Sequence, residues 1–349
     1  PPPVFGLHFV SHKNIKRYVM SSLKKFILST IIPASLFLIT ACKKEQLGSS
    51  TENSPTVKTY QNLSDFFATN KLERMQFVTI NNSDFEADTI ITNLGTHFFV
   101  LKDAFETMDG TPVTGNIEIG FIELYDKKDL LLLGHSNMGY LQNGLTPLIS
   151  GGQFYISAKQ NGQELRLKEN HYCYIYHIPA GSNTTPAFLF HRLINEQNQV
   201  FWSKAESIEV ENGPDYMSVN EYDGAYYTSN NTLGWAGIAH FASMTGAQSP
   251  LSLQLPSGHT SENTAVYVSI DGVTSLGELH ATQSGIFASV PGYTLPIGTS
   301  VHFVIISHTT GTLKAAIVPA MITSNHIQFV QEPEEMSSIE LSVLLNSLP

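Results

Sequence analysis

Alternating runs of apolar and polar residues, separated by turn residues, begin at Gln76 and continue through most of the chain. In the run 116–124, Ile117, Ile119 and Phe121 fall on one face, with polar or small residues between them. A period of two is the pattern of a half-buried β-strand, and no sustained helical spacing interrupts this region. The chain is therefore expected to be mostly antiparallel β-sheet.

The segment 61–180 is expected to form a first β-sandwich. Phe154 and Ile156 repeat the alternation, and Asn161-Gly162 then gives the signal of a tight hairpin. Residues 181–235 are less regular and are interpreted as a connecting region with a few strands of its own.

A second, smaller β-sandwich is expected over residues 236–332. Leu251, Leu253 and Leu255 alternate with polar residues there, as in a half-buried strand. The overall prediction is an all-β chain with two antiparallel β-sandwich domains in tandem and a short C-terminal helix.

The C-terminal helix is predicted within residues 333–349. Ser337 and Glu340 have the spacing of a capping box, which satisfies free backbone N–H groups at a helix start. One face of the helix carries Leu341, Leu344, Leu345 and Leu348. We expect that face to pack on the last sheet.

Residues 20–41 have the layout of an export signal. Lys24 and Lys25 precede an apolar run, 26–39, of about 14 residues, whereas a membrane-spanning helix needs about 20. The run is therefore interpreted as a cleaved segment. Residues 1–19 are interpreted as upstream sequence, translated from a start codon set too early.

The end of this segment, Ile39-Thr40-Ala41-Cys42, is similar to the bacterial lipobox. The resemblance implies cleavage between Ala41 and Cys42 and attachment of a diacylglycerol to the Cys42 thiol. The alternative is an ordinary signal peptide with a chance cysteine near its end. Residues 42–60 are polar and lack apolar periodicity, which predicts a flexible tether.

Charge and cysteine content restrict what the mature chain can do. Without residues 1–41 it carries 14 basic and 30 acidic residues, a formal charge of −16. Because binding to phosphate backbones needs lysine and arginine, a nucleic-acid partner is not expected. With Cys42 lipidated, only Cys173 remains, so no internal disulfide can form.

Several turn and strand motifs resemble a recurrent module of envelope lipoproteins. They are Gly95-Thr96, Asp109–Ile117, Phe121-x-Glu123 and the run 150–158. The module occurs in cell-envelope lipoproteins of the Bacteroidetes type and is distantly similar to the ZU-five-like β-sandwich. The resemblance covers roughly residues 76–179, and it implies a fold rather than an activity.

A companion module of the same lipoproteins resembles residues 235–330. The likeness is carried by Ile297-Gly298-Thr299-x-Val301, and the module is similar to carboxypeptidase-regulatory or transthyretin-like sandwiches. Where the companion often reads Trp-x-Asn-Cys-Asp, this chain has Trp235-Ala236-Gly237-Ile238-Ala239. The resemblance therefore implies no functional site at that strand of this chain.

Histidine and cysteine residues near position 173 are candidate metal ligands. On a strand, His171, Cys173 and His177 face one side, and zinc accepts such donors. However, His171 and His177 would lie about 20 Å apart at about 3.3 Å per residue, too far for one ion. No metal and no cofactor are predicted.

The opposite face of the same strand carries three tyrosines, Tyr172, Tyr174 and Tyr176. Exposed aromatic rings can stack on sugar rings, which makes the three tyrosines a candidate ligand site. The alternative is that they pack within the sandwich.

No catalytic residue is predicted. The segment Gly134–Gly139 reads G-x-S-x-x-G, one residue longer than a nucleophile elbow, and lies in a β context without a following helix. Motifs for metalloproteases, phosphate loops, dinucleotide binding and EF-hands are not found.

The leading hypothesis is a non-catalytic lipoprotein, anchored to the cell outer membrane through Cys42, that presents two β-sandwiches to a glycan or an envelope protein. One alternative is a hydrolase or processing enzyme acting on envelope glycan or peptide. Another is an accessory subunit of an export or nutrient-uptake complex. The sequence leaves open whether the protein faces the periplasm or the cell surface.

Overall fold

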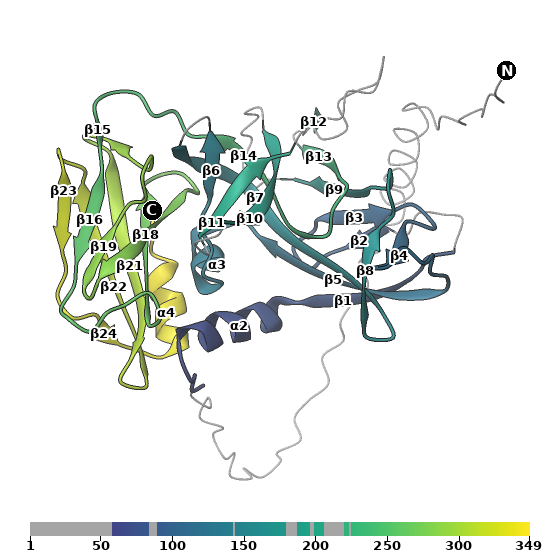
Figure 1. The fold of residues 1–349 in the computed structure, drawn as a ribbon, viewed down its shortest axis with the longest axis horizontal. Coiled ribbons are helices and arrows are strands. Elements are labelled where there is room, and N and C mark those ends of the chain that lie inside the picture. The colour runs from purple at the N-terminus through teal and green to yellow at the C-terminus, as the bar shows by residue number, and fades with distance from the viewer. Residues whose placement is uncertain are drawn as a thin grey trace, which may run out of the picture. The chain divides into compact units, whose positions relative to one another are not determined.

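The structure is a computed structural model that describes residues 58–83, 89–141, 144–178, 187–195, 199–205, 220–222 and 225–349. All of them fall in one compact unit, Thr56–Pro349. The chain forms two β-rich bodies and a short C-terminal helix, as the alternation predicted (Figure 1). None of the helices among these residues has the length and apolar character needed to cross a bilayer.

The first body contains a nine-stranded sheet. Its main strands, in spatial order, are β1 (Gln76–Asn81), β5 (Asn116–Leu124), β7 (Gly144–Gln160), β14 (Gly234–Phe241), β10 (Phe188–Ile194), β11 (Val200–Lys204) and β6 (Met138–Leu141). The short β4 (Phe105–Thr107) and β8 (Gln163–Leu167) complete it. All pairings are antiparallel except that of β11 with β6.

The hairpin predicted at Asn161-Gly162 joins β7 to β8. Both turn residues have positive φ, 52° and 79°, which is the backbone that a two-residue hairpin of this type requires. Glycine and asparagine adopt it at low cost, so the dipeptide determines the turn.

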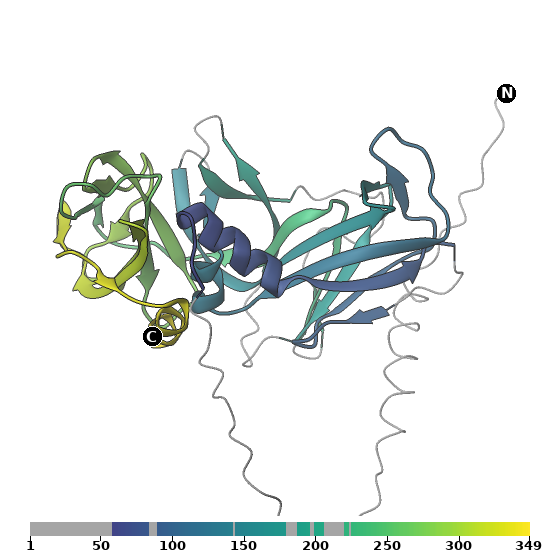
Figure 2. The same cartoon turned by 90° about the horizontal axis from the view of Figure 1, so that it is seen from below.

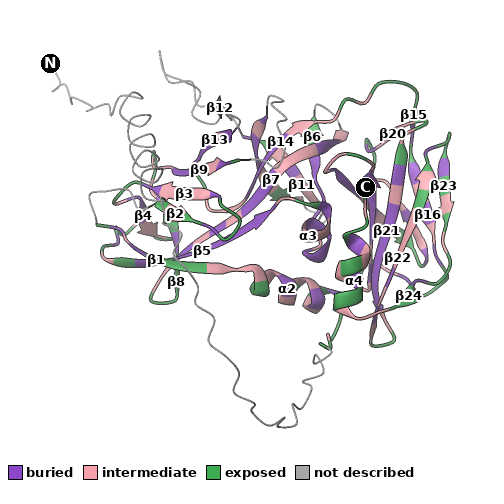
Figure 3. Ribbon diagram, turned by 180° about the vertical axis from the view of Figure 1, so that it is seen from behind, coloured by how far each residue is buried: buried purple, intermediate pink, exposed green. Residues whose placement is uncertain are grey.

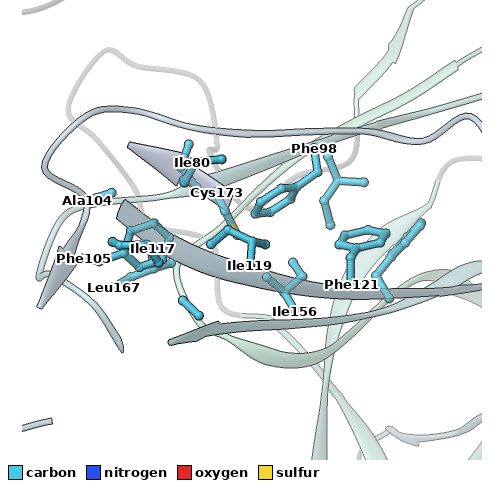
Figure 4. Packing of buried hydrophobic residues seen from close by; sticks show 14 of the residues in the cluster. Ile80, Phe98, Ala104, Phe105, Ile117, Ile119, Phe121, Ile156, Leu167 and Cys173 are labelled. Atoms are coloured by element: carbon cyan, nitrogen blue, oxygen red, sulfur yellow. The ribbon is translucent and has the colours of Figure 1, made fainter. Parts of the chain in front are cut away.

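A second, five-stranded sheet lies in the first body. Its order is β12 (Asn220–Tyr222), β13 (Ala225–Asn230), β9 (Cys173–His177), β3 (His97–Val100) and β2 (Thr89–Ile91). The predicted inward residues Ile117, Ile119 and Phe121 are buried and belong to one cluster with Phe98 and Cys173, shown in Figure 4. The core of the body therefore forms between residues of the two sheets.

The strand pairing differs from two expectations. It assigns both the expected connecting region, 181–235, and the start of the expected second sandwich to the first body. The described strands β10 to β13 belong to sheets of the first body, and β14 pairs with β7 over its whole length. The first body thus extends to Phe241. The region resembles a connector in the sequence because the pairings that tie it to the first body, β13 with β9 and β14 with β7, join strands far apart in the chain.

The second body is built on an eight-stranded sheet. In spatial order its strands are β23 (His326–Phe329), β16 (Leu251–Gln254), β19 (Ile286–Ala288), β18 (Leu276–Gln283), β17 (Thr264–Ile270), β21 (Ser300–Thr309), β22 (Thr312–Met321) and β24 (Glu334–Glu335). A two-stranded sheet of β15 (Gln248–Ser249) and β20 (Leu295–Pro296) accompanies it. The predicted alternation of Leu251, Leu253 and Leu255 is confirmed, because all three are buried.

Three helices are described: α2 (Leu63–Arg74), α3 (Lys127–Leu132) and α4 (Ser338–Leu345). The capping box of Ser337 and Glu340 at α4 is confirmed, and Leu341 and Leu345 are buried beneath it. The helices α2 and α3 were not predicted. Each helix begins at a residue whose side chain caps it, Asn62 for α2 and Asp126 for α3. The surrounding β-strand pattern makes these caps hard to recognise in the sequence.

Each helix contributes to one hydrophobic cluster, called here the shared cluster, that joins the two bodies. Its buried members are Leu63, Phe66, Ile122, Leu124, Leu130, Leu131, Leu132, Leu133, Tyr267, Leu276, Val304, Ile306, Leu313, Ala315, Leu341 and Leu345. Figure 3 shows α3 largely buried, and Figure 2 shows α2 continuing into β1. The bodies are therefore packed on each other through one continuous core.

Asn137 adds hydrogen bonds across the same boundary. Its backbone N–H donates to the Leu276 carbonyl at 2.8 Å and its side-chain amide donates to the Thr274 carbonyl at 2.8 Å. The Leu276 N–H donates in turn to Asn137 Oδ1. The residue is almost fully buried, so these groups have no access to water.

We expect Asn137→Ala to lower the free energy of unfolding by about 2–4 kcal/mol, because it leaves a buried N–H and a buried carbonyl without their partners. The measurement is the urea midpoint. Asn116→Ala, at an exposed position of β5, is the matched control and should change stability little. Equal midpoints for the two variants would contradict the role given to Asn137.

Candidate functional site

The predicted lipidation and cleavage residues, Cys42 and Ala41, lie outside the described residues. The other cysteine, Cys173, is a free thiol buried in the first body. Burial raises the pKa of this thiol to about 12, so it stays protonated at neutral pH. Cys173 has the surroundings of a core residue and not of a nucleophile.

His171, Cys173 and His177 are not brought together as a metal site. His171 lies in the loop before β9, where its Nδ1 is 3.0 Å from the carbonyl oxygen of Glu169. The His177 ring stacks on Tyr125 at 4.1 Å, and burial lowers the pKa of this imidazole to about 4. Among the described residues, no group of three or more histidine, cysteine or acidic side chains is placed to hold a metal ion.

The three candidate tyrosines are engaged in packing. Tyr174 is 6% exposed, and its ring stacks between Phe99, at 4.8 Å and 13°, and Tyr227, at 6.2 Å and 20°. Because sugar stacking needs a free ring face, Tyr174 is not available for it.

The neighbouring tyrosines differ from Tyr174 in their contacts. Tyr176 meets the His97 ring edge-on at 5.5 Å, and Tyr172 packs against a small cluster formed by Leu189, Ala205 and Ala236. This arrangement favours the packing interpretation of the tyrosine stripe over the sugar-binding one.

A pocket of about 240 Å³ lies where α2 and the turn after α3 meet the face of β17 and β18. The lining residues are Leu63, Ser64, Phe67, Gly134, Ser261, Glu262, Thr264, Ala265, Tyr267, Glu278, Leu279, His280, Ala281 and Phe287. They combine apolar side chains with two carboxylates, an imidazole and several hydroxyls. Small-molecule sites likewise place polar groups within an apolar surface.

Glu278 is the most perturbed acid of this pocket. It lies opposite Tyr267 on the neighbouring strand, on the face that meets the first body. Burial raises the pKa of its carboxyl group to about 7, against the opposing effect of the positive charge of Arg192. The hydroxyl of Ser136 also holds this pKa down, although its Oγ forms no hydrogen bond of ordinary length and angle within the described structure.

Ser136 and its neighbour His135 were the residues of the elbow-like segment. His135 Nδ1 is 3.1 Å from Gln153 Oε1, and its ring packs against Trp235 at 4.1 Å. Burial lowers the pKa of His135 to about 3, which keeps it neutral. A serine nucleophile needs a base within hydrogen-bond reach, and the Nδ1 of His135 contacts Gln153 instead.

The sequence does not reveal this pocket, because its residues are scattered over five segments. One signal is present: Leu276, Glu278 and His280 alternate, which puts a carboxylate on the same strand face as the buried Leu276. A charged residue at a core-facing position is a functional candidate that spacing alone can identify.

Comparisons with known proteins give little guidance. No family model matches the sequence, and no curated protein does. Among solved structures, a gamma-CGTase from Alkalophilic bacillus clarkii aligns with 70% of this chain at 11% identity and a TM-score of 0.18. The aligned part spans 40% of that enzyme chain. At this TM-score the likeness carries no argument about fold or activity.

The raised pKa of Glu278 predicts a change of stability with pH. Folding raises this pKa from 4.5 to about 7, so the contribution of Glu278 is most favourable below pH 4.5 and is lost as the pH rises through 7. The loss amounts to roughly 3 kcal/mol at most. We expect Glu278→Gln to abolish it.

Urea unfolding from pH 5 to pH 8 tests this expectation. The stability of Glu278→Gln relative to the wild type should increase over that range, while the neutral buried histidines affect both proteins equally. Glu169→Gln, at an exposed position, removes the same charge and serves as control. A constant difference across the range would contradict the ionisation assigned to Glu278.

Proposed function

We propose that the protein is a non-catalytic lipoprotein of the bacterial cell envelope, held to the outer membrane through a lipid on Cys42. Its two β-rich bodies act as one unit for ligand binding or complex assembly, with an envelope glycan or protein as partner. The excess of acidic residues disfavours a nucleic-acid partner.

The observation that carries this proposal is the pocket at the boundary of the bodies. It has the apolar surface, hydroxyls and carboxylates of a binding site. Beside the pocket, His135 is engaged by Gln153, and the Oγ of Ser136 has no hydrogen-bond partner among the described residues. This combination of groups supports the holding of a ligand.

The shared cluster supports the same proposal, because it restricts the motion of one body relative to the other. Flexible, independent modules would be suited to separate partners, whereas bodies that share a core move together. A partner bound by one body is thereby held at a fixed position relative to the other. This property is useful for assembly on a membrane surface.

Membrane fractionation tests the tether. We expect the wild-type chain to sediment with membranes and to incorporate labelled fatty acid, whereas Cys42→Ala should do neither, because it lacks the acceptor thiol. Cys173→Ala removes the other cysteine and should keep both properties. A Cys42→Ala protein that remains lipid-labelled would refute the proposed anchor.

A further inference from the structure

The charges that line the pocket at the boundary of the bodies are of one sign. Glu262 and Glu278 both line it, and no lysine or arginine of the described residues does. The nearest basic influence is Arg192, which acts on Glu278 through its charge without forming an ion pair with it. Anionic ligands such as phosphates and carboxylates are therefore disfavoured in this pocket.

Neither carboxylate has an ion-pair partner within the part of the chain that the structure describes. Glu262 is exposed, whereas Glu278 is partly buried and lies opposite the buried Tyr267 on the neighbouring strand. Removing a carboxylate from water without a counter-charge is unfavourable. A ligand that brings a positive charge would relieve this penalty.

The rest of the pocket limits the size and shape of such a ligand. Its volume of about 240 Å³ lies below the roughly 300–1,000 Å³ of sites for drug-sized ligands. Phe67 and Phe287 supply aromatic rings, which attract cations, and Ser64 and Ser261 supply hydroxyl acceptors for N–H groups. The fit is to a compact molecule with a short apolar body.

We infer that this pocket binds a small organic ammonium ion, with its nitrogen at Glu278 and Glu262 and its carbon chain against the apolar lining. The inference rests on the binding function proposed above and names the chemical class of its ligand. The ammonium group forms charge-assisted hydrogen bonds to the carboxylates.

Three probes of equal chain length test the class of ligand on the full chain in detergent: n-butylammonium, 1-butanol and butanoate. We expect saturable binding of butylammonium by titration calorimetry, and binding of the alcohol and the acid that is weaker by about tenfold or more. Equal binding of the three probes, or no binding of butylammonium, would overturn the inference.

Variants locate the site. Glu278→Gln and Glu262→Gln should each weaken butylammonium binding about fivefold or more, and Ser64→Phe should block the mouth of the pocket without changing charge. Glu169→Gln is the charge-matched control and should bind normally. Glu262 and Ser64 are exposed, so their variants keep the test valid if Glu278→Gln does not fold. Unchanged binding by the Glu262→Gln and Ser64→Phe variants would refute this location.

The same preparations are scored for membrane retention. A chain that is lipid-anchored but fails to bind butylammonium overturns only the ligand assignment. A chain that binds butylammonium without being lipid-anchored overturns the proposed tether and leaves the pocket in place.

Discussion

Burial of apolar side chains between the two β-rich bodies is the interaction on which the structure depends. The shared cluster takes leucines from three helices and packs them on the faces of β5 and β21. Burying a leucine contributes about 1.5–3 kcal/mol, so this boundary resembles the interior of a domain more than a contact between modules. The helices, which are few, are concentrated where the sheets alone would leave apolar faces exposed.

Two polar residues at this boundary differ in their partners. Asn137 pairs its amide with backbone groups of the second body, which fixes the relative position of the strands. Glu278 lies nearby without an ion-pair partner among the described residues. The first arrangement is typical of structural residues, whereas a carboxyl group with a perturbed pKa in a pocket is a candidate functional residue.

The sequence predicted the elements whose signals are local. The period of two at Ile117 to Phe121, the Asn161-Gly162 turn and the Ser337 cap depend on neighbours in the chain, and all three are confirmed. Pairing between distant strands is not encoded locally, so β14 was expected in the wrong body. The pocket was missed for the same reason, since its lining comes from segments that only the fold brings together.

The short junction between α2 and β1 has a mechanical consequence. A pull on the chain ahead of residue 58 reaches α2 first, where Leu63 and Phe66 are held in the shared cluster. Only after these side chains are extracted does the load pass through Met75 to β1, an edge strand paired with β5 alone. The packing of α2 in the shared cluster thus resists tension before the hydrogen bonds between β1 and β5 are loaded.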